Sequence, residues 1–218
     1  LTGDGNLWWA GATNRCVEHI LSRAAPADLV LTLNNDTIVP VDYLENLLAA
    51  HRKFPDALIG SLVVALDDPE SIVSGETEII WKTGLKHYKS RPGDHVPLAK
   101  DDIVTVPKLP GKGTLIPVGV FRAIGMYDAR SFPQYAADDD FSMRAAEAGF
   151  GLRLSYKARL HNDTTTTGLG MGFGAPRLWP FVRSFWSIRS PNNVVTRTRF
   201  ALRHCPRSCA SWMPTACS

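Results

Sequence analysis

The order of the apolar segments in the first third of the chain constrains the fold most. Residues 29–33 and 58–66 are short apolar runs rich in Leu and Val, and residues 41–53 carry leucines at helical spacing. Strands that are apolar throughout are typical of sheets buried on both faces, and a helix between two such strands indicates a layered domain. We therefore expect an α/β fold.

Further segments fit the same architecture. The helix at residues 41–53 is expected to turn Leu44, Leu47 and Leu48 toward the core, and a strand at residues 152–160 is expected to end beside His161. The other expected elements are a helix at residues 14–22, a hairpin from residues 78–81 and 85–88, a strand entered from residues 111–118, a short helix at residues 120–124 and a helix at residues 141–148.

Composition limits what the chain can be. Its 218 residues, 44% of them hydrophobic, are enough to bury one sizeable core, and its longest apolar runs are far too short to span a bilayer. The sequence starts without Met or a secretory signal, in a glycine-rich turn, so we expect the first elements of the fold to be missing. The four cysteines fit no common zinc pattern, and reduced thiols predict a cytoplasmic protein.

Charge is distributed unevenly along the chain. Residues 164–218 contain seven arginines and no Asp or Glu, whereas the rest of the chain carries 17 basic and 21 acidic residues. Aromatic side chains interleave with these arginines, which favours peripheral contact with anionic lipid headgroups. A basic surface that covers the acidic body of the protein explains the composition equally well. Nucleic acid binds the same kinds of side chain, but we expect none as a partner.

Three consecutive carboxylates, Asp138, Asp139 and Asp140, precede an Ala-rich helical stretch. Adjacent carboxylates repel one another, so such a run is stable at a helix start, beside a cation or beside a reacting proton. Asp140 and Arg144 are four residues apart and are expected to pair, which leaves another carboxylate available as a general base. An acidic cap without chemistry is the simpler interpretation, but three carboxylates are more than a cap requires.

Polar residues after the first buried strand suit a ligand site. Asn34, Asn35 and Asp36 lie where α/β sheets bind ligands, and Asp36 can hold a divalent cation that also binds phosphate. An Asx turn before Pro40 is an equally good explanation. His161, among small polar residues, is accessible to a metal, although a lone His is more often structural.

The segment from Gly111 to Thr114 is a weaker candidate. Gly111 and Gly113 let the backbone approach a ligand, and Thr114 together with backbone N–H groups can donate to an oxyanion. The segment lacks the full spacing of a nucleotide phosphate loop, so a simple turn before a strand explains it as well.

Together, these segments resemble the family 2 inverting glycosyltransferases with a GT-A fold, most of all bacterial enzymes that build rhamnose- or galactose-containing surface polysaccharides. The resemblance runs from about residue 3 to about residue 204, in the family's order, and is carried by residues 8–14 (WWAGATN), 33–37 (LNNDT), 111–117 (GKGTLIP) and 132–144 (FPQYAADDDFSMR). It implies a mixed, GT-A-like (Rossmann-like) sheet flanked by helices, without the family's first two βα units.

The resemblance also implies a division of the chain. We expect a partial glycosyltransferase domain at residues 1–175 and a basic, aromatic helical extension at residues 176–206. Residues 207–218 cease to resemble the family, and their Cys, Ser and Pro content predicts a disordered or non-native tail.

Individual roles follow from the same resemblance. Asp36 stands in the family's Asp-x-Asp motif, with Asn34 at the first position, and is the expected ligand of Mg²⁺ or Mn²⁺ on the donor diphosphate. Asp138 falls at the catalytic-base position, after Ala137 in place of a second acid, and His161 falls at a metal-binding position. The implied donor- and acceptor-binding residues are Asn34, Asn35, Asp36, Gly111, Gly113, Thr114, Asp139, Asp140 and Arg144, with residues 168–174 as further acceptor contacts.

The implied reaction moves a sugar from a nucleotide-diphosphate sugar to a glycan or lipid-linked acceptor at the inner face of the plasma membrane. Asp138 removes a proton from the acceptor hydroxyl, and attack from the opposite face inverts the anomeric carbon. Two alternatives stay open: a nucleotidyltransferase on a related sheet, and a catalytically inactive fragment that only binds partners or membrane. Metal-dependent donor binding separates the enzymes from the inactive fragment.

Overall fold

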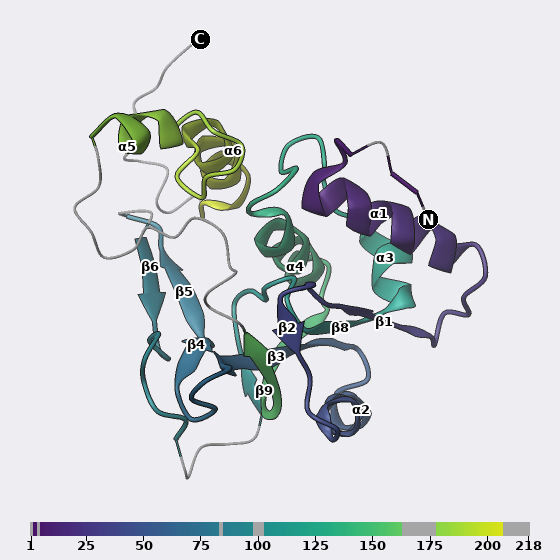
Figure 1. The fold of residues 1–218 in the computed structure, drawn as a ribbon. Helices are drawn as coiled ribbons and strands as arrows, with labels where there is room; N and C mark the ends of the chain where they lie inside the picture. Colours follow the sequence, from purple (N-terminus) through teal and green to yellow (C-terminus); the bar gives the residue numbers. More distant parts are fainter. Residues whose placement is uncertain (1, 4, 83–84, 98–102, 163–177, 207–218) are drawn as a thin grey trace.

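The computed structural model describes residues 2–3, 5–82, 85–97, 103–162 and 178–206 (Figure 1). The helices are α1 (Trp8–Leu21), α2 (Tyr43–Lys53), α3 (Val118–Ile124), α4 (Ala137–Glu147), α5 (Leu178–Ser184) and α6 (Val194–His204). The strands are β1 (Leu29–Thr32), β2 (Thr37–Ile38), β3 (Ala57–Ala65), β4 (Ile72–Ser74), β5 (Thr77–Ile80), β6 (Leu85–Tyr88), β7 (Ile103–Thr105), β8 (Thr114–Pro117) and β9 (Gly151–Asn162).

The main sheet is mixed, which confirms the expected fold class. Its strand order is β1-β8-β3-β9-β2, with β4 beside β3 and β7 beside β9. β3 and β9 are parallel, whereas β8 is antiparallel to both of its neighbours, β1 and β3. β1, β3 and β9 therefore run in one direction, and their carboxyl ends lie along the same edge of the sheet.

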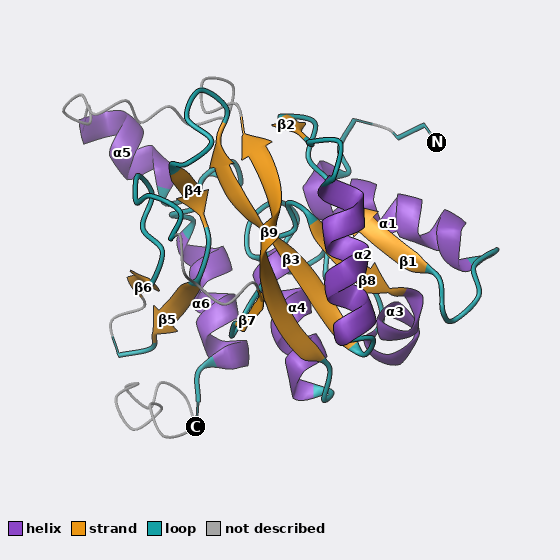
Figure 2. Ribbon diagram, turned by 90° about the horizontal axis from the view of Figure 1, so that it is seen from below, coloured by secondary structure: helices purple, strands orange, loops and turns teal. Residues whose placement is uncertain are grey.

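Helices cover both faces of this sheet (Figure 2). On one face, α2 packs Leu47 and Ala50 against β3 and β9; on the other, α1, α3 and α4 form the larger core. Neighbouring residues of β3 face opposite cores: Ile59 belongs to the α2 side and Leu58 to the other. Every residue of β3 is buried, which is the physical reason for its uninterrupted apolar sequence.

Two expected helices differ in detail. α1 begins at Trp8, not at residue 14. The N–H group of Trp9 donates to the Gln134 side chain and that of Ala10 to the Pro133 carbonyl, so a loop far along the chain satisfies the first turn of the helix. In α2, Leu44 is wrong as a core residue, since it is 51% exposed. Tyr43 is buried in its place, and its hydroxyl lies 2.8 Å from Ser61 Oγ.

The start of α4 also differs from the expectation. The helix begins at Ala137, so the three carboxylates lie inside its first turn and not before it. Ala136, just ahead of the helix, has a left-handed backbone with φ of 66°. The expected hairpin at β5 and β6 and the short helix α3, ended by Gly125, are confirmed.

The basic segment near the end of the chain lies against the body in part. α6 contacts α4, and the Phe200 ring lies 6.2 Å from the Trp81 ring and 6.1 Å from the Phe132 ring between centroids. Arg203 of α6 also forms ion pairs with Asp128 and Asp140, so the alternative in which basic residues cover acidic ones is correct for this part of α6. By contrast, Trp179 of α5 and Trp186 after it are 75% and 70% exposed.

No helix in the described ranges is long and apolar enough to cross a membrane. The division at residues 175 and 206 stays a prediction. The expected acceptor loop at residues 168–174 and the tail at residues 207–218 lie outside the described residues.

Candidate active site

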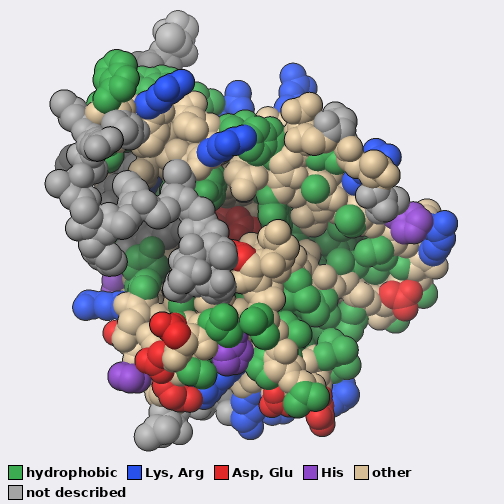
Figure 3. All heavy atoms as spheres, viewed as in Figure 1, with side chains coloured by type: hydrophobic (Ala, Val, Ile, Leu, Met, Phe, Trp, Pro, Cys, Tyr) green, Lys and Arg blue, Asp and Glu red, His purple; other side chains and the backbone are tan. Residues whose placement is uncertain are grey.

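A cleft of about 860 Å³ opens beyond the carboxyl end of β1. Figure 3 shows acidic side chains in a recess of one face, in the region of α4; among the residues that line the cleft, the acidic one is Asp36. Asn34, Asn35 and Asp36, the expected donor-binding segment, all line the cleft, together with Trp9, Ala12, Thr13, Cys16, Leu33, Thr37, Ile38, Leu66 and Gln134. The cleft therefore lies at the edge of the sheet where α/β proteins bind ligands.

Trp9 joins the two halves of the site. Its indole Nε1 donates to Asn34 Oδ1 over 3.1 Å, and its ring packs edge-on against Tyr127 at 5.1 Å between centroids. A Cβ placed on Gly111 would lie 2.4 Å from two atoms of the Trp9 ring. Glycine at position 111 therefore leaves the room that the Trp9 ring occupies, and a Cβ there would force the ring or the loop to shift.

Asp138 lies on the other side of Gly111. The Gly111 N–H donates to Asp138 Oδ2 over 2.8 Å, and the side chain is half-buried. Burial and the neighbouring charge of Asp139 raise the pKa of Asp138, against the opposing effects of the Gly111 hydrogen bond and Lys108. A carboxylate whose charged form is disfavoured in this way is a stronger proton acceptor than an exposed one.

Asp139 and Asp140 are neutralised by cations. Lys108 donates to Asp139, and both side chains are nearly buried. Burial lowers the pKa of Lys108, but the charge of Asp139, its hydrogen bond and the charge of Asp138 together outweigh burial, and the pKa is raised. Asp139 is thereby committed to an ion pair.

Asp140 is fully buried and has three partners. Arg144 Nε, Arg203 Nη1 and His204 Nε2 lie 2.9, 2.8 and 2.9 Å from its oxygens. Burial raises the pKa of Asp140, but the bonds to His204, Arg203 and Arg144 outweigh it and lower the pKa to about 2. The predicted pair of Asp140 with Arg144 is confirmed, and the two partners from α6 add to it.

Asp36 has one oxygen paired and one without a partner. Lys112 Nζ lies 3.6 Å from Asp36 Oδ2 and also donates to Asn162 Oδ1. Burial lowers the pKa of Lys112, and the charge of Asp36 opposes that effect. Asp36 Oδ1 is buried, and no hydrogen-bond partner for it exists in the described part of the chain.

The residues fit a divalent cation that is shared with a phosphate ligand. A buried carboxylate oxygen without a partner is a suitable ligand for Mg²⁺ or Mn²⁺, which commonly use one or two carboxylates and complete their shell with phosphate oxygens and water. Within the described ranges, no three His, Cys, Asp or Glu side chains are grouped to form a metal site without such a ligand. His161 lies near the end of β9, paired with Ile38 on β2 and Val64 on β3.

The loop before β8 is held by its own hydrogen bonds. Gly113 has φ of +73°, its N–H donates to the Thr32 carbonyl, and its carbonyl accepts from Ser61 Oγ. The Thr114 hydroxyl donates to the Pro110 carbonyl over 2.6 Å, and Thr114 is 3% exposed. These bonds fix the backbone on both sides of Lys112.

Several site residues were not recognised in the sequence. Trp9 and Lys112 lie in segments that carry the resemblance but were given no individual role, and Lys108 and Asn162 lie in no motif. Each of the four contacts a partner distant in sequence. His204 was also not recognised, although its Nε2 lies 2.9 Å from Asp140. The absence of acids around it was the available signal, since buried cations require carboxylates from elsewhere.

Comparison with solved structures defines the class of fold. The chain is similar to the crystal structure of GalNAc-T7 with UDP, GalNAc and Mn²⁺, with a TM-score of 0.57, 14% sequence identity and coverage of 75% of this chain. The fold is therefore a GT-A-like glycosyltransferase fold. The match spans 32% of the GalNAc-T7 chain, about a third of its length. No family model and no curated protein sequence matches the chain.

Proposed function

We propose that the chain is a glycosyltransferase that transfers a sugar from a nucleotide-diphosphate sugar to a hydroxyl of a glycan or lipid-linked acceptor. The observation that carries this proposal is the contrast among the three carboxylates of α4. Asp139 and Asp140 are paired with cations, whereas Asp138 has no cationic partner within ion-pair distance in the described chain and has a raised pKa. One carboxylate is thus left to act as a base.

Each group has a role in this reaction. Asp138 accepts the proton of the acceptor hydroxyl, and Gly111 holds its second oxygen so that the carboxylate keeps its orientation. Asn34, Asn35 and Asp36 line the cleft that receives the donor. Asp36, with His161, would hold Mg²⁺ or Mn²⁺, which when bound supplies positive charge to the departing diphosphate.

The residues buried around Asp138 act as supports. Thr114 and Gly113 shape the loop that carries Gly111, while Asp139, Asp140 and Arg144 fix the first turn of α4. We assign them to positioning of the donor and acceptor groups. Attack on the face opposite the leaving group, with inversion at the anomeric carbon, is what the resemblance to the family 2 enzymes implies, and a single positioned base at Asp138 is consistent with it.

Calorimetric titration tests the donor site. UDP, dTDP and GDP are titrated into the wild-type chain with Mn²⁺ and again with EDTA. We expect one nucleotide to bind only with the metal, to lose binding in Asp36→Asn and to keep it in Asp138→Asn. Asp56→Asn, an exposed carboxylate between α2 and β3, is the matched control. Absence of binding to a folded sample, or binding unaffected by EDTA and by Asp36→Asn, contradicts the proposal.

The finer assignment rests on the sequence motifs. We infer membership in the family 2 inverting enzymes, a bacterial source and a role in surface polysaccharide synthesis from the four ordered segments described above. Product analysis by NMR decides the stereochemical part, because inversion of an α-linked donor gives a β-linked product. A product with retained configuration contradicts it.

We also infer peripheral contact with the cytoplasmic face of an anionic membrane. The side chains of Trp179 and Trp186 are exposed and line a small pocket with Val182 and Arg183. Tryptophans at this exposure, next to arginines, suit the boundary between headgroups and acyl chains. Sedimentation with vesicles of phosphatidylcholine, with and without phosphatidylglycerol, tests this. The double variant Trp179→Ser/Trp186→Ser should lose binding to the anionic vesicles, and Leu202→Ser, an exposed apolar control on α6, should keep it.

A further inference from the structure

The ammonium group of Lys112 stands beside the carboxylate expected to hold the divalent cation. We propose that Lys112 is a second cation of the donor site and binds an oxygen of the donor diphosphate directly, next to the metal at Asp36. The inference rests on the proposed function and deepens it, since it names a residue and a charge arrangement for the same site.

The first observation is the place of the ammonium. Lys112 Nζ lies 3.6 Å from Asp36 Oδ2 and donates to Asn162 Oδ1 at the end of β9. An ammonium carries three N–H groups, and these two acceptors leave one N–H for a ligand. The Lys112 side chain is 18% exposed, so the ammonium group is mostly buried but still accessible to a ligand.

The second observation is that hydrogen bonds hold the backbone on both sides of Lys112. On one side of Lys112, the Gly111 N–H is bound to Asp138; on the other, Gly113 is held by Thr32 and Ser61. The backbone of Lys112 is therefore held on both sides. The residue follows directly after the one that binds the proposed base, and its side chain reaches the proposed metal ligand Asp36.

The third observation concerns charge. The diphosphate of a nucleotide sugar carries two negative charges, and when the bond to the sugar breaks, the electron pair stays on the diphosphate and adds a third. Asp36 by itself would repel this group. A divalent cation and the Lys112 ammonium together leave two net positive charges beside Asp36, which matches the bound donor. Lysine is well suited as a point charge for phosphate.

A purely structural role makes different predictions. If Lys112 only holds Asp36 and Asn162 in place, its removal disturbs the carboxylate, and binding of the metal and of the nucleotide weaken together. If Lys112 binds the diphosphate, its removal weakens the nucleotide alone. Binding of Mn²⁺ alone then becomes stronger, because a cation close to the metal site is gone and like charges repel.

The test uses Lys112→Met and Lys112→Arg in the full chain. Binding of Mn²⁺ alone is followed by electron paramagnetic resonance of the free ion. Binding of the diphosphate that the wild-type chain accepts, among UDP, dTDP and GDP, is followed by calorimetry in Mn²⁺, with the corresponding nucleoside as a probe without phosphates. Lys53→Met, which removes the same charge from the exposed end of α2, is the control.

We expect Lys112→Met to weaken the diphosphate by about 10- to 100-fold, as for loss of a hydrogen bond between charged groups, and to leave the nucleoside unchanged. Mn²⁺ alone should bind it as tightly as the wild type or more tightly, and Lys112→Arg should recover most of the diphosphate affinity. An unchanged diphosphate affinity in Lys112→Met overturns the inference and leaves the proposed function intact. A parallel loss for Mn²⁺ alone also overturns it. If the wild-type chain binds none of the diphosphates, the proposed function fails, and the inference fails with it.

Discussion

Asp138 and Asp140 lie two residues apart in the first turn of α4, and their surroundings are opposite. Asp140 is fully buried and receives bonds from three basic side chains, which lower its pKa to about 2. Asp138 borders Gly111 and has a raised pKa. In one short motif, the surroundings thus stabilise the charged form of Asp140 and destabilise the charged form of Asp138. Such separation of pKa values is how a site distinguishes structural from reactive acids.

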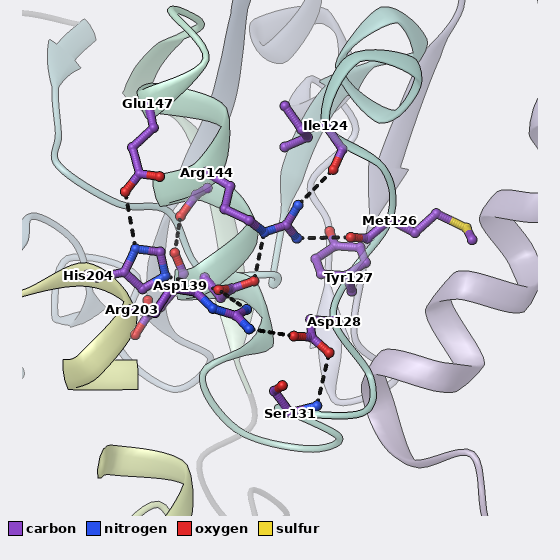
Figure 4. A network of polar contacts seen from close by, with 12 residues as sticks. Ile124, Met126, Tyr127, Asp128, Ser131, Asp139, Arg144, Glu147, Arg203 and His204 are labelled. Carbon is purple, nitrogen blue, oxygen red and sulfur yellow. Dashed lines mark hydrogen bonds and ion pairs between the residues drawn. The ribbon is translucent and has the colours of Figure 1, made fainter. Parts of the chain in front are cut away.

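The region around Asp140 explains why the difference can persist (Figure 4). Arg144 also donates to the carbonyls of Ile124 and Met126, both 2.9 Å away, and ties α4 to the loop after α3. Arg203 reaches Asp128, and His204 reaches Glu147. These contacts tie both ends of α4 to α6 and to the loop after α3. Two of the three carboxylates in this turn, Asp139 and Asp140, are thus paired with cations, which lowers the repulsion that Asp138 experiences from its neighbours.

The largest expected effect comes from removing the carboxylate of Asp138, the proposed base. Asp138→Asn should reduce the rate of sugar transfer by about 10²–10⁴-fold, the usual contribution of a positioned base. The melting temperature should stay the same or rise, because a carboxylate with a raised pKa costs stability when ionised. A transfer assay and thermal unfolding measure both quantities. Loss of folding in this variant would contradict the role of Asp138 as the base.

The next largest effect comes from removing the charge of Asp140, the carboxylate that holds three basic side chains. Asp140→Asn leaves Arg144, Arg203 and His204 without a buried anion, and we expect a loss of about 3–5 kcal/mol in the free energy of unfolding. Urea denaturation measures it. Glu147→Gln is the control, because Glu147 contacts the same histidine but its side chain is 62% exposed, and it should change stability by less than about 1 kcal/mol. Equal stability of the two variants would contradict the network.

A substitution at Gly111 sharpens the comparison, because it should disturb the surroundings of Asp138 and leave those of Asp140 unchanged. Gly111→Ala places a Cβ 2.4 Å from the Trp9 ring, and such overpacking costs about 1–3 kcal/mol. Transfer should fall as Trp9 leaves Asn34, while the Asp140 network is untouched. Gly119→Ala in α3, whose Cβ would meet only the Pro26 carbonyl at 3.8 Å, is the matched control. An active Gly111→Ala with an unchanged near-ultraviolet spectrum of its tryptophans would show that Trp9 does not need this space.

Acid sensitivity gives a smaller effect with opposite signs at the two residues. The pKa of Asp140 is lowered from 3.8 to about 2 in the folded chain. Its contribution of about 2 kcal/mol is therefore complete above pH 3.8 and is lost as the pH falls toward 2. For Asp138, with a raised pKa, the favourable contribution exists below pH 3.8 and is lost as the pH rises through the folded-state pKa. Unfolding of Asp140→Asn should depend less on pH below 4 than that of the wild type, and a parallel dependence would refute the assignment.

The layered part of the fold was predictable because it depends on local patterns. β3 is buried on both faces, and its sequence is apolar almost throughout. α2 carries leucines at helical spacing, and of these Leu47 is fully buried. The start of α1 could not be predicted, since its first N–H groups are satisfied by Pro133 and Gln134. Sequence periodicity near residue 8 contains no information about a loop 125 residues further along the chain.

The candidate site divides in the same way. The pair of Asp140 with Arg144 was predicted from its four-residue spacing and is confirmed. Asp36 and Asp138 were named from the resemblance of their segments to a known family, and their roles stay predictions. Lys108 was not recognised, and Lys112 was given no role within the segment from Gly111 to Thr114, because a lysine in a loop is usually solvated and only the folded chain brings each to its carboxylate. His204 was missed for the same reason, since α6 meets α4 only through tertiary packing.

The most direct test of this comparison is titration of the aspartate carboxyl carbons by NMR in the folded wild-type chain. Asp138→Asn and Asp140→Asn serve to assign the two signals. We predict that Asp138 titrates above the ordinary value of 3.8 and Asp140 well below it, near 2. If the two carboxyl groups titrate together, or in the reverse order, the separation into a reactive and a structural carboxylate is wrong.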